Sequence, residues 1–212
     1  MENPVIIFGA NGLGRSAQEI FNSNDIIIYC FLDDDKSLHG QEFNDIVIMG
    51  RTDDDGYLKY IGKKCEAFVA YDDNTYRKNI AKMLKERRKV TPVNAIHKMT
   101  TIAPSASLGN GNFVNAGVTI GANCTVGNLC MLNTNAIIEH DTEIGDFVQI
   151  GAGSIINAGV KIGEEAFIGS GAIIVAGVEI GKGARVGAGS LVISSVEEGE
   201  TVFGNPAKPI EG

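Results

Sequence analysis

The sequence predicts two structural classes in series, a small α/β domain followed by a β-solenoid. Two observations predict this. From Ile102 to Val192 an aliphatic residue returns at every sixth position, without insertion or deletion. Before residue 97 the rhythm is different, because short apolar runs alternate with segments of helical periodicity. A period of six fits neither a helix nor a lone alternating strand, but it fits short strands separated by turns.

Each hexad is numbered here from its aliphatic residue, position 1. These residues are Ile102, Leu108, Val114, Ile120, Val126, Leu132, Ile138, Ile144, Ile150, Ile156, Ile162, Ile168, Ile174, Ile180, Val186 and Val192. Position 5 is small or β-branched, with Asn112 as the clear departure. Glycine often fills position 2, as in Ile144-Gly145 and Ile180-Gly181, where we expect a turning backbone to need freedom in φ.

The first 96 residues predict strands and helices in alternation. The expected strands are Val5–Phe8, Ile26–Leu32, Ile46–Met49 and Ala67–Tyr71, and the expected helices are Leu13–Asn22 and Thr75–Lys89. This order is typical of a parallel sheet with covering helices. Asp73 or Asn74 is the expected cap of the second helix, and the basic residues that end it suit the helix dipole. We therefore place the domains at residues 1–96 and 97–212.

Composition excludes several classes of function. A net charge of -8 disfavours nucleic-acid binding, which needs a basic face. The sequence has no apolar run near the ~18 residues of a membrane span and opens without a basic leader, so a cytoplasmic protein is expected. All four cysteines are expected to be buried and reduced rather than nucleophiles or metal ligands: Cys30, Cys65, Cys124 and Cys130.

A glycine turn follows the first predicted strand. It reads Gly9-Ala10-Asn11-Gly12-Leu13-Gly14 and can bring backbone amides and a helix N-terminus to a phosphate. About nineteen residues later comes Asp33-Asp34-Asp35, where a dinucleotide fold places an acid that accepts hydrogen bonds from ribose or base. Together these features favour nucleotide binding over a merely structural tight turn.

The two halves together carry a set of landmarks that spans nearly the whole chain: Gly9–Gly14, Phe31–Asp34, Asn94–Lys98, Ala103–Ala106, Glu139-His140-Asp141 and Gly204–Lys208. In this order the set resembles the bacterial sugar acetyltransferases of the sialic acid O-acetyltransferase and bacillosamine UDP-4-amino-sugar N-acetyltransferase type. The resemblance implies a Rossmann-like N-terminal domain followed by a left-handed parallel β-helix. This helix has three hexads per turn of a triangular prism, and therefore roughly five turns here.

Stacking residues eighteen apart gives a column of Pro104, Ala122, His140, Ala158 and Ala176, in which His140 alone is large. By position alone a turn histidine is usually without function, but the resemblance makes His140 the catalytic base. A neighbouring carboxylate can fix its tautomer and raise its basicity, and the resemblance assigns this role to Asp141 rather than Glu139. Asn133 either orients the substrate or ring, as the family implies, or forms an asparagine ladder with Asn115.

Three glycine-containing steps also stack eighteen apart: Gly151–Gly153, Gly169–Gly171 and Gly187–Gly189. They are either ordinary β-helix corners or a smooth groove for an extended pantetheine arm. The resemblance implies that acetyl-CoA binds there between subunits of a homotrimer. It points to Ala158, Gly159, Ser170 and Ala188 as contacts, and Lys182, Arg185 or Lys208 could meet the CoA phosphates.

The expected activity is acetyl transfer from acetyl-CoA to the amine of a nucleotide-linked amino sugar, without metal or acyl-enzyme. The sugar nucleotide is expected at Gly12, Leu13, Gly14, Asp33, Asp34 and Asp72. Gln149 stands where many members of the family have a second histidine near the thioester, and Leu13 stands where the bacillosamine enzyme has histidine. Two alternatives stay open, a sugar O-acetyltransferase and a non-catalytic nucleotide-binding trimeric scaffold.

Overall fold

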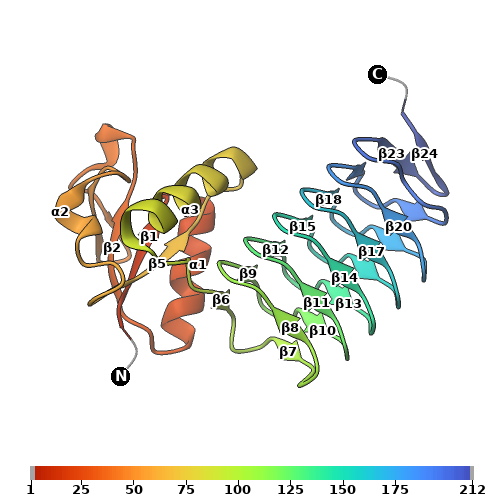
Figure 1. Cartoon of the computed structure of the whole chain (residues 1–212), viewed down its shortest axis with the longest axis horizontal. Coiled ribbons are helices and arrows are strands. Elements are labelled where there is room, and N and C mark those ends of the chain that lie inside the picture. Colours follow the sequence, from red (N-terminus) through yellow and green to blue (C-terminus); the bar gives the residue numbers. More distant parts are fainter. Residues whose placement is uncertain (1–2, 211–212) are drawn as a thin grey trace. The chain divides into compact units, whose positions relative to one another are not determined.

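The computed structural model describes residues 3–210 (Figure 1). The chain forms two compact units, one ending at Lys98 and the other beginning at Met99. Unit 1 is an α/β domain and unit 2 a β-helix, which confirms the predicted fold class. None of the helices within residues 3–210 combines the length and apolarity that a bilayer crossing requires.

Unit 1 contains a five-stranded sheet in the order β3-β4-β2-β1-β5. Its strands are β1 (Val5–Phe8), β2 (Ile28–Leu32), β3 (Glu42–Phe43), β4 (Ile46–Gly50) and β5 (Glu66–Val69). The four predicted strands pair in parallel as expected, and the sheet has in addition β3, which was not predicted and pairs antiparallel with β4. The turn between them places Asn44 and Asp45 at φ 43° and 67°. Two consecutive left-handed residues are typical of a tight hairpin, and asparagine and aspartate tolerate them best.

Helices cover both faces of this sheet. On one face α1 (Gly12–Ser23) buries Ala17, Ile20 and Phe21, and the Phe21 ring packs edge-on against Phe68. The other face is covered by α2 (Asp55–Leu58) and α3 (Asn74–Arg88). A short 3-10 helix (Lys36–Leu38) follows β2, and β6 (Ala95–Ile96) packs beside α1.

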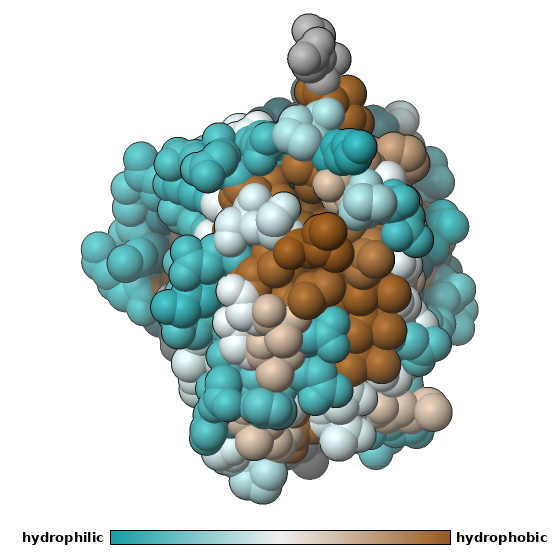
Figure 2. All heavy atoms as spheres, turned by 90° about the vertical axis from the view of Figure 1, so that its right-hand side faces the viewer, coloured by the Kyte–Doolittle hydropathy of each residue, from teal (hydrophilic) through white to brown (hydrophobic). Residues whose placement is uncertain are grey.

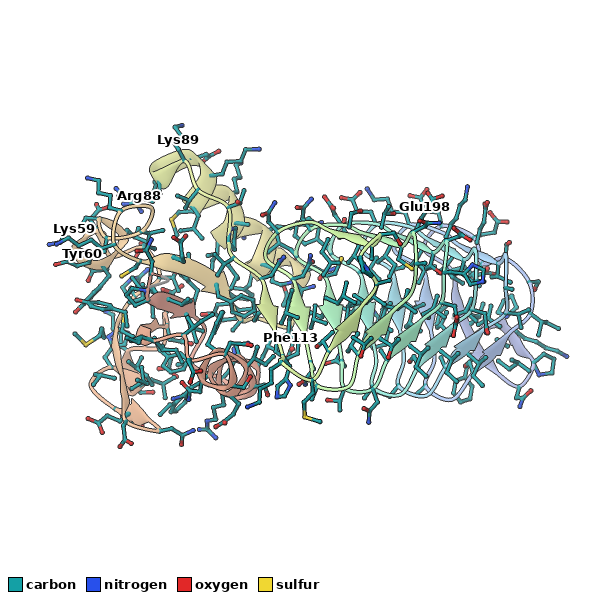
Figure 3. The ribbon with its side chains drawn as sticks, turned by 90° about the horizontal axis from the view of Figure 1, so that it is seen from below. Lys59, Tyr60, Arg88, Lys89, Phe113 and Glu198 are labelled. Carbon is teal, nitrogen blue, oxygen red and sulfur yellow. The ribbon has the colours of Figure 1, made fainter. Side chains whose placement is uncertain are left out.

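The ends of α3 follow the expected capping chemistry. Asp73, not Asn74, is the N-cap, and its carboxylate accepts from Thr75 N at 2.7 Å and Tyr76 N at 3.1 Å. At the other end, Figure 3 shows Arg88 on the side of α3 that faces the segment with Lys59 and Tyr60. The Arg88 guanidinium donates to the carbonyl oxygen of Lys59 at 3.0 Å, so this basic residue also fastens the loop before β5.

Unit 2 is a prism whose three faces are parallel sheets, with one antiparallel hairpin at the C-terminal end of face 3. Face 1 carries β7 (Thr101–Ile102), β10 (Thr119–Ile120), β13 (Ile137–Ile138), β16 (Ile155–Ile156), β19 (Ile173–Ile174) and β22 (Leu191–Val192). Face 2 carries β8 (Ser107–Leu108), β11 (Thr125–Val126), β14 (Glu143–Ile144), β17 (Lys161–Ile162) and β20 (Glu179–Ile180). Face 3 carries β9 (Phe113–Val114), β12 (Met131–Leu132), β15 (Gln149–Ile150), β18 (Phe167–Ile168) and β21 (Arg185–Val186), then the hairpin β23 (Thr201–Gly204) and β24 (Ala207–Pro209).

Three hexads complete one turn of the prism, as predicted. Each strand pairs with the strand one turn later, so that Ile120 lies opposite Ile138 and Ile138 opposite Ile156. Side chains at positions 1 and 5 point inward and form the core. The exception, Asn112, is fully buried with its amide satisfied, because its oxygen accepts from Cys130 N at 2.7 Å and its nitrogen donates to Gly127 O at 3.0 Å.

The four cysteines are buried and unpaired with one another, as the sequence predicts. Burial, together with the neighbouring Cys65, raises the pKa of the Cys30 thiol to about 12. Such a thiol stays protonated at neutral pH and is a poor nucleophile.

Backbone strain falls at position 4 and not at position 2. In every hexad from Gly111 to Gly189 the residue at position 4 is left-handed, with φ between 56° and 73°. The interpretation of Gly145 and Gly181 as flexible corners is therefore wrong, because neither has a positive φ. A Cβ on Gly145 would lie 2.7 Å from Glu164 N, and one on Gly181 would lie 2.5 Å from Glu198 N. These glycines are required because the next coil leaves no room for a side chain.

The outer surfaces of the faces differ in a way that the repeat does not reveal. Position 6 points outward. On face 1 its last four residues are Ile137, Ile155, Ile173 and Leu191, and on face 2 its residues are Ser107, Thr125, Glu143, Lys161 and Glu179. Face 1 is thus apolar over most of its length, whereas face 2 is polar and carries the Glu143–Lys161 ion pair at 3.8 Å.

Candidate active site

His140 and Asp141 form the turn between β13 and β14, at positions 3 and 4 of their hexad. The His140 Nδ1 atom lies 2.8 Å from Asp141 Oδ2, and both side chains are more than half exposed. Asp141 has φ 59°, so the left-handed turn directs its carboxylate back to the preceding ring. The repeat therefore builds this pair from consecutive residues.

The charge of Asp141 fixes the tautomer of the ring. The hydrogen bond with His140, followed by one from Asn123, lowers the pKa of the Asp141 carboxyl below its ordinary value. An ionised carboxylate only accepts, so the proton of a neutral His140 ring resides on Nδ1 and its lone pair on Nε2. Nε2 is then the atom that can take a proton from a substrate.

Asn123 is a member of this cluster that the sequence patterns do not single out. Its Nδ2 donates to Asp141 Oδ1 at 3.2 Å from the coil before. It occupies position 4, eighteen residues before Asp141, so the same stacking that isolates His140 could have located it. Asn123 therefore binds Oδ1 of Asp141, the carboxylate oxygen that does not contact His140.

Small residues surround His140 on the turns above and below. Asp141 N donates to Ala122 O at 2.9 Å, and Gly159 N donates to His140 O at 3.0 Å, so Ala122, Ala158 and Gly159 stack directly around the pair. We call the column of Ala122, His140, Ala158 and Ala176, between faces 1 and 2, the His140 edge. A Cβ on Gly159 would meet nothing within 4 Å, so the space beside the pair is open.

The other predicted prism residues lie at a different edge. Asn133 follows β12, and its Nδ2 donates to Ile150 O at 3.0 Å, so its amide is tied to the next coil. The ladder with Asn115 is not formed through the Asn133 amide nitrogen, because Asn115 Oδ1 accepts from Ala116 N at 2.8 Å instead. Gln149 lies in β15 of face 3, one residue before the end of that strand.

The stacked glycine steps form the edge between faces 3 and 1, which we call the glycine edge: Gly151–Gly153, Gly169–Gly171 and Gly187–Gly189. The first glycine of each step is demanded by sterics, since a Cβ on Gly169 would lie 2.4 Å from Ala188 N. The last has a positive φ and open space, as at Gly171. Ser170 and Ala188 lie between them as the side chains of this edge.

One chain therefore does not bring the predicted catalytic and acetyl-CoA residues together. His140, Asp141, Ala158 and Gly159 lie on the His140 edge, whereas Asn133, Ser170 and Ala188 lie on the glycine edge. The whole width of face 1 separates the two edges.

In unit 1 the three glycines of the turn after β1 differ in the space around their Cα atoms. Gly9 has φ 112°, and a Cβ there would lie 2.5 Å from Ala70 O. Gly14 allows α1 to pack, because a Cβ there would lie 2.1 Å from Gly9 O. Gly12 meets nothing within 4 Å, so it faces open space. The Asn11 side chain caps α1 by accepting from Leu13 N at 2.9 Å and Gly14 N at 3.0 Å.

The expected acidic residues after β2 are engaged by their own loops. Asp33 Oδ2 accepts from Ala10 N at 2.8 Å, and Asp34 accepts from Thr52 N at 3.1 Å. Asp33 also raises the pKa of the Tyr71 phenol, after the larger effect of burial. Asp33 thus joins the glycine turn to the end of the sheet.

Asp72 is exposed in the loop between β5 and α3. Its carbonyl oxygen accepts from the buried Arg77 guanidinium at 2.9 Å, as does that of Tyr71 at 2.8 Å. Asp33, Asp72 and the glycine turn all follow the carboxyl ends of parallel strands, so they share one edge of the sheet.

A separate groove of about 580 Å³ lies on face 2, and of the predicted site residues it contains Lys182, a candidate contact for the CoA phosphates. It is lined by side chains such as Glu143, Lys161, Glu179 and Glu198, the last labelled in Figure 3. The histidines, cysteines, aspartates and glutamates of residues 3–210 form no group of three or more that could hold a metal ion.

Comparison with known families gives two matches. Residues 4–84 match the PglD N-terminal domain, and residues 159–194 match the bacterial transferase hexapeptide (six repeats). The curated proteins gave no match.

Solved structures match over the full length. A variant of perosamine N-acetyltransferase from Caulobacter crescentus, in complex with CoA and GDP-perosamine, is 30% identical with a TM-score of 0.87, over 100% of this chain and 99% of that one. The acetyltransferase domain of PglB from Neisseria gonorrhoeae, in complex with acetyl coenzyme A, is 27% identical with a TM-score of 0.89, over 99% and 100%. WeeI from Acinetobacter baumannii is 27% identical with a TM-score of 0.84, over 98% and 99%.

Proposed function

The chain belongs to the hexapeptide-repeat sugar acetyltransferases, and from this membership we propose that it transfers the acetyl group of acetyl-CoA to the amino group of a nucleotide-linked amino sugar. The observation that carries the proposal for this chain is the His140–Asp141 pair, whose Nδ1–Oδ2 contact of 2.8 Å leaves Nε2 as the basic atom. A relative of 30% identity holds CoA and GDP-perosamine, the two classes of ligand that the proposal requires.

The chemistry needs one base and no covalent enzyme intermediate. The uncharged amine of the sugar attacks the thioester carbonyl carbon, and His140 Nε2 removes the proton that the nitrogen must lose. Asp141 stabilises the resulting imidazolium through Nδ1. As the tetrahedral intermediate collapses, the C–S bond breaks, and the CoA sulfur leaves as a thiolate that takes up a proton. A backbone amide near the glycine edge is the expected donor to the oxyanion.

The separation of the two edges supports a site shared between copies of the chain. We propose a homotrimer in which the His140 edge of one copy lies against the glycine edge of the next. Acetyl-CoA would then contact Ala158 and Gly159 of one copy and Gln149, Ser170 and Ala188 of the other, with Asn133 near the reacting groups.

Face 1 gives this arrangement a driving force. Ile155, Ile173 and Leu191 point outward there, and Ile173 is 37% exposed in the single chain. Removing such side chains from water favours association, whereas burying the charged residues of face 2 would cost desolvation energy. We therefore propose face 1 as the principal surface between copies.

The sugar nucleotide is assigned to the sheet edge of unit 1. Gly12 offers backbone without a side chain, and Leu13, Gly14, Asp33, Asp34 and Asp72 flank it. Because the Asp33 and Asp34 carboxylates already hold backbone amides, we propose that they shape the pocket as well as contact the ligand.

The test is an assay of acetyl-CoA-dependent thiol release with GDP-, UDP- and dTDP-linked amino sugars, with products identified by mass. One acetyl group added to the amine is the expected result. Acetyl transfer to hydroxyl groups alone would replace the proposal with sugar O-acetylation. Nucleotide binding without CoA binding or turnover would indicate a scaffold.

A further inference from the structure

The glycine edge ends in an aromatic side chain. Val202 pairs with Val186, so the next residue, Phe203, occupies the position of Gly187 one turn later. Its ring packs on that glycine, since a Cβ on Gly187 would lie 2.2 Å from the ring. The two preceding coils have Gly151 and Gly169 here, where the following coil leaves no room for a Cβ, and at the last coil that restriction is gone.

Phe203 is the exposed aromatic residue of unit 2. The unit contains four aromatic residues, all phenylalanine: Phe113, Phe147, Phe167 and Phe203. Phe113 is buried, and the Arg185 guanidinium covers the Phe167 ring at 4.6 Å. Phe203 is 56% exposed. Figure 2, which views the C-terminal end of the prism, shows apolar surface gathered there.

A lysine lies directly across the terminal hairpin from this ring. Phe203 in β23 and Lys208 in β24 are register partners in an antiparallel pair, so their side chains lie on the same side of the hairpin. The other lysines and arginine of unit 2 are engaged, Lys161 with Glu143, Lys182 with Glu164, and Arg185 with Phe167. Lys208 is exposed and forms no ion pair with any carboxylate of residues 3–210.

We propose that Phe203 and Lys208 bind the nucleotide end of CoA, the ring stacking on adenine and the ammonium contacting the 3′-phosphate. The inference rests on the proposed function, which places the pantetheine arm along the glycine edge. An exposed ring offers any base a stacking surface, and an uncommitted cation offers charge to a phosphate. In unit 2, whose net charge is negative, these two properties occur together at the end of this edge.

The consequence is selectivity for the donor. An enzyme that reads adenine and the 3′-phosphate binds CoA thioesters more tightly than short thioesters with the same pantetheine arm. Phe203 and Lys208 would set this preference without contacting the reacting atoms.

The test is calorimetric binding of CoA, 3′-dephospho-CoA and pantetheine to the full chain and three variants. Phe203→Leu keeps an apolar side chain on Gly187 but removes the ring, and should weaken CoA binding about tenfold. Lys208→Met should weaken CoA several-fold and leave 3′-dephospho-CoA unchanged. Neither should alter pantetheine binding. Lys161→Met, whose partner is Glu143 on face 2, is the matched control and should bind all three ligands like the unaltered chain.

Unchanged CoA affinity in both variants would overturn the inference, as would equal weakening for CoA and pantetheine, since that indicates a structural role. Absence of CoA binding to the unaltered chain would also overturn it. Failure of the proposed function looks different, because CoA binding that depends on Phe203 and Lys208 can persist when no amino sugar is acetylated.

Discussion

The His140 edge and the glycine edge are built by the same hexad, yet they present opposite surfaces. At position 4 the His140 edge has Asn123 and Asp141 and then Gly159, whereas the glycine steps of the other edge have Gly153 and Gly171. Both sets adopt the left-handed conformation that the turn requires. The fold demands the backbone shape at this position and leaves the side chain to function, because aspartate and asparagine tolerate a positive φ better than most residues.

This difference teaches where a β-helix can hold chemistry. At Gly151, Gly169 and Gly187, position 2 of the glycine edge has no room for a side chain. Position 3 points outward at both edges and carries His140 on one and Ser170 on the other. A reactive side chain can therefore replace alanine at position 3 without disturbing the core. The His140 edge carries the base but not the stacked glycine steps. A complete site therefore needs the His140 edge of one copy and the glycine edge of another.

Replacing His140 should have the largest effect on turnover, because neither edge would then carry a catalytic base. We expect His140→Ala to lower kcat about 10²- to 10⁴-fold while the Kd for acetyl-CoA changes little. Steady-state kinetics and calorimetry measure the two effects. His97→Ala, outside the repeat, should keep normal turnover, and an active His140→Ala variant would remove His140 as the base.

A charge on face 1 should disrupt the contact between the His140 edge of one copy and the glycine edge of the next. Ile173→Glu places a carboxylate among the apolar side chains between them, so we expect the trimer to dissociate and turnover to fall with it. Light scattering reports the mass. Thr125→Glu makes a similar change on the polar face 2 and should leave the trimer intact. A monomeric unaltered chain would contradict the shared site.

Within one glycine step, alanine substitutions can distinguish a glycine that is required by lack of space from one that is required by its positive φ. Gly169→Ala forces a Cβ against backbone at 2.4 Å and should lower the free energy of unfolding by about 3 kcal/mol. Gly171→Ala has open space but φ 70°, and should cost about 1 kcal/mol. Urea unfolding at one fixed chain concentration compares them. The reverse order would show that φ dominates at this edge.

The support of the base should give the smallest effects. Asp141→Asn keeps the shape but loses the charge that stabilises the imidazolium, so we expect about a tenfold fall in kcat. Asn123→Ala removes one hydrogen bond to Asp141 and should cost only about twofold to threefold. A larger loss in Asn123→Ala than in Asp141→Asn would place the main support of the ring elsewhere.

The pKa shift of Asp141 adds a pH test to this pair. The bond from His140 lowers the pKa of Asp141, so the carboxylate stays charged as pH falls through the usual range for aspartate. The Asp141–His140 bond should therefore persist until the pH falls below that lowered pKa. Nitrogen NMR of the His140 ring measures this hydrogen bond directly. Loss of the hydrogen bond from Nδ1–H to Asp141 while the pH is still above that lowered pKa would contradict the prediction.

Much of this architecture could be predicted from the sequence. The period of six predicts the coils, and positions 1 and 5 predict the side chains that are buried in the core from Val114 to Val192. The column spacing placed His140 among small residues. The hairpin at Asn44-Asp45 carried a turn signal but lacked a long apolar run, so it was not predicted. Asn123 belongs to no motif and was not predicted either, although its position eighteen residues before Asp141 could have located it.

The sequence by itself determined the repeat, the inward side chains and the position of His140, because each depends on local spacing along the chain. Only the tertiary structure decided that Gly145 and Gly181 are required by contact with the next coil and not by φ, since the contacting atoms belong to Glu164 and Glu198, one turn of the prism later. It also decided that Phe203 faces Lys208, and that His140 and Ser170 lie on different edges. Such relations arise when a periodic chain is wound in three dimensions, where residues distant in sequence become neighbours.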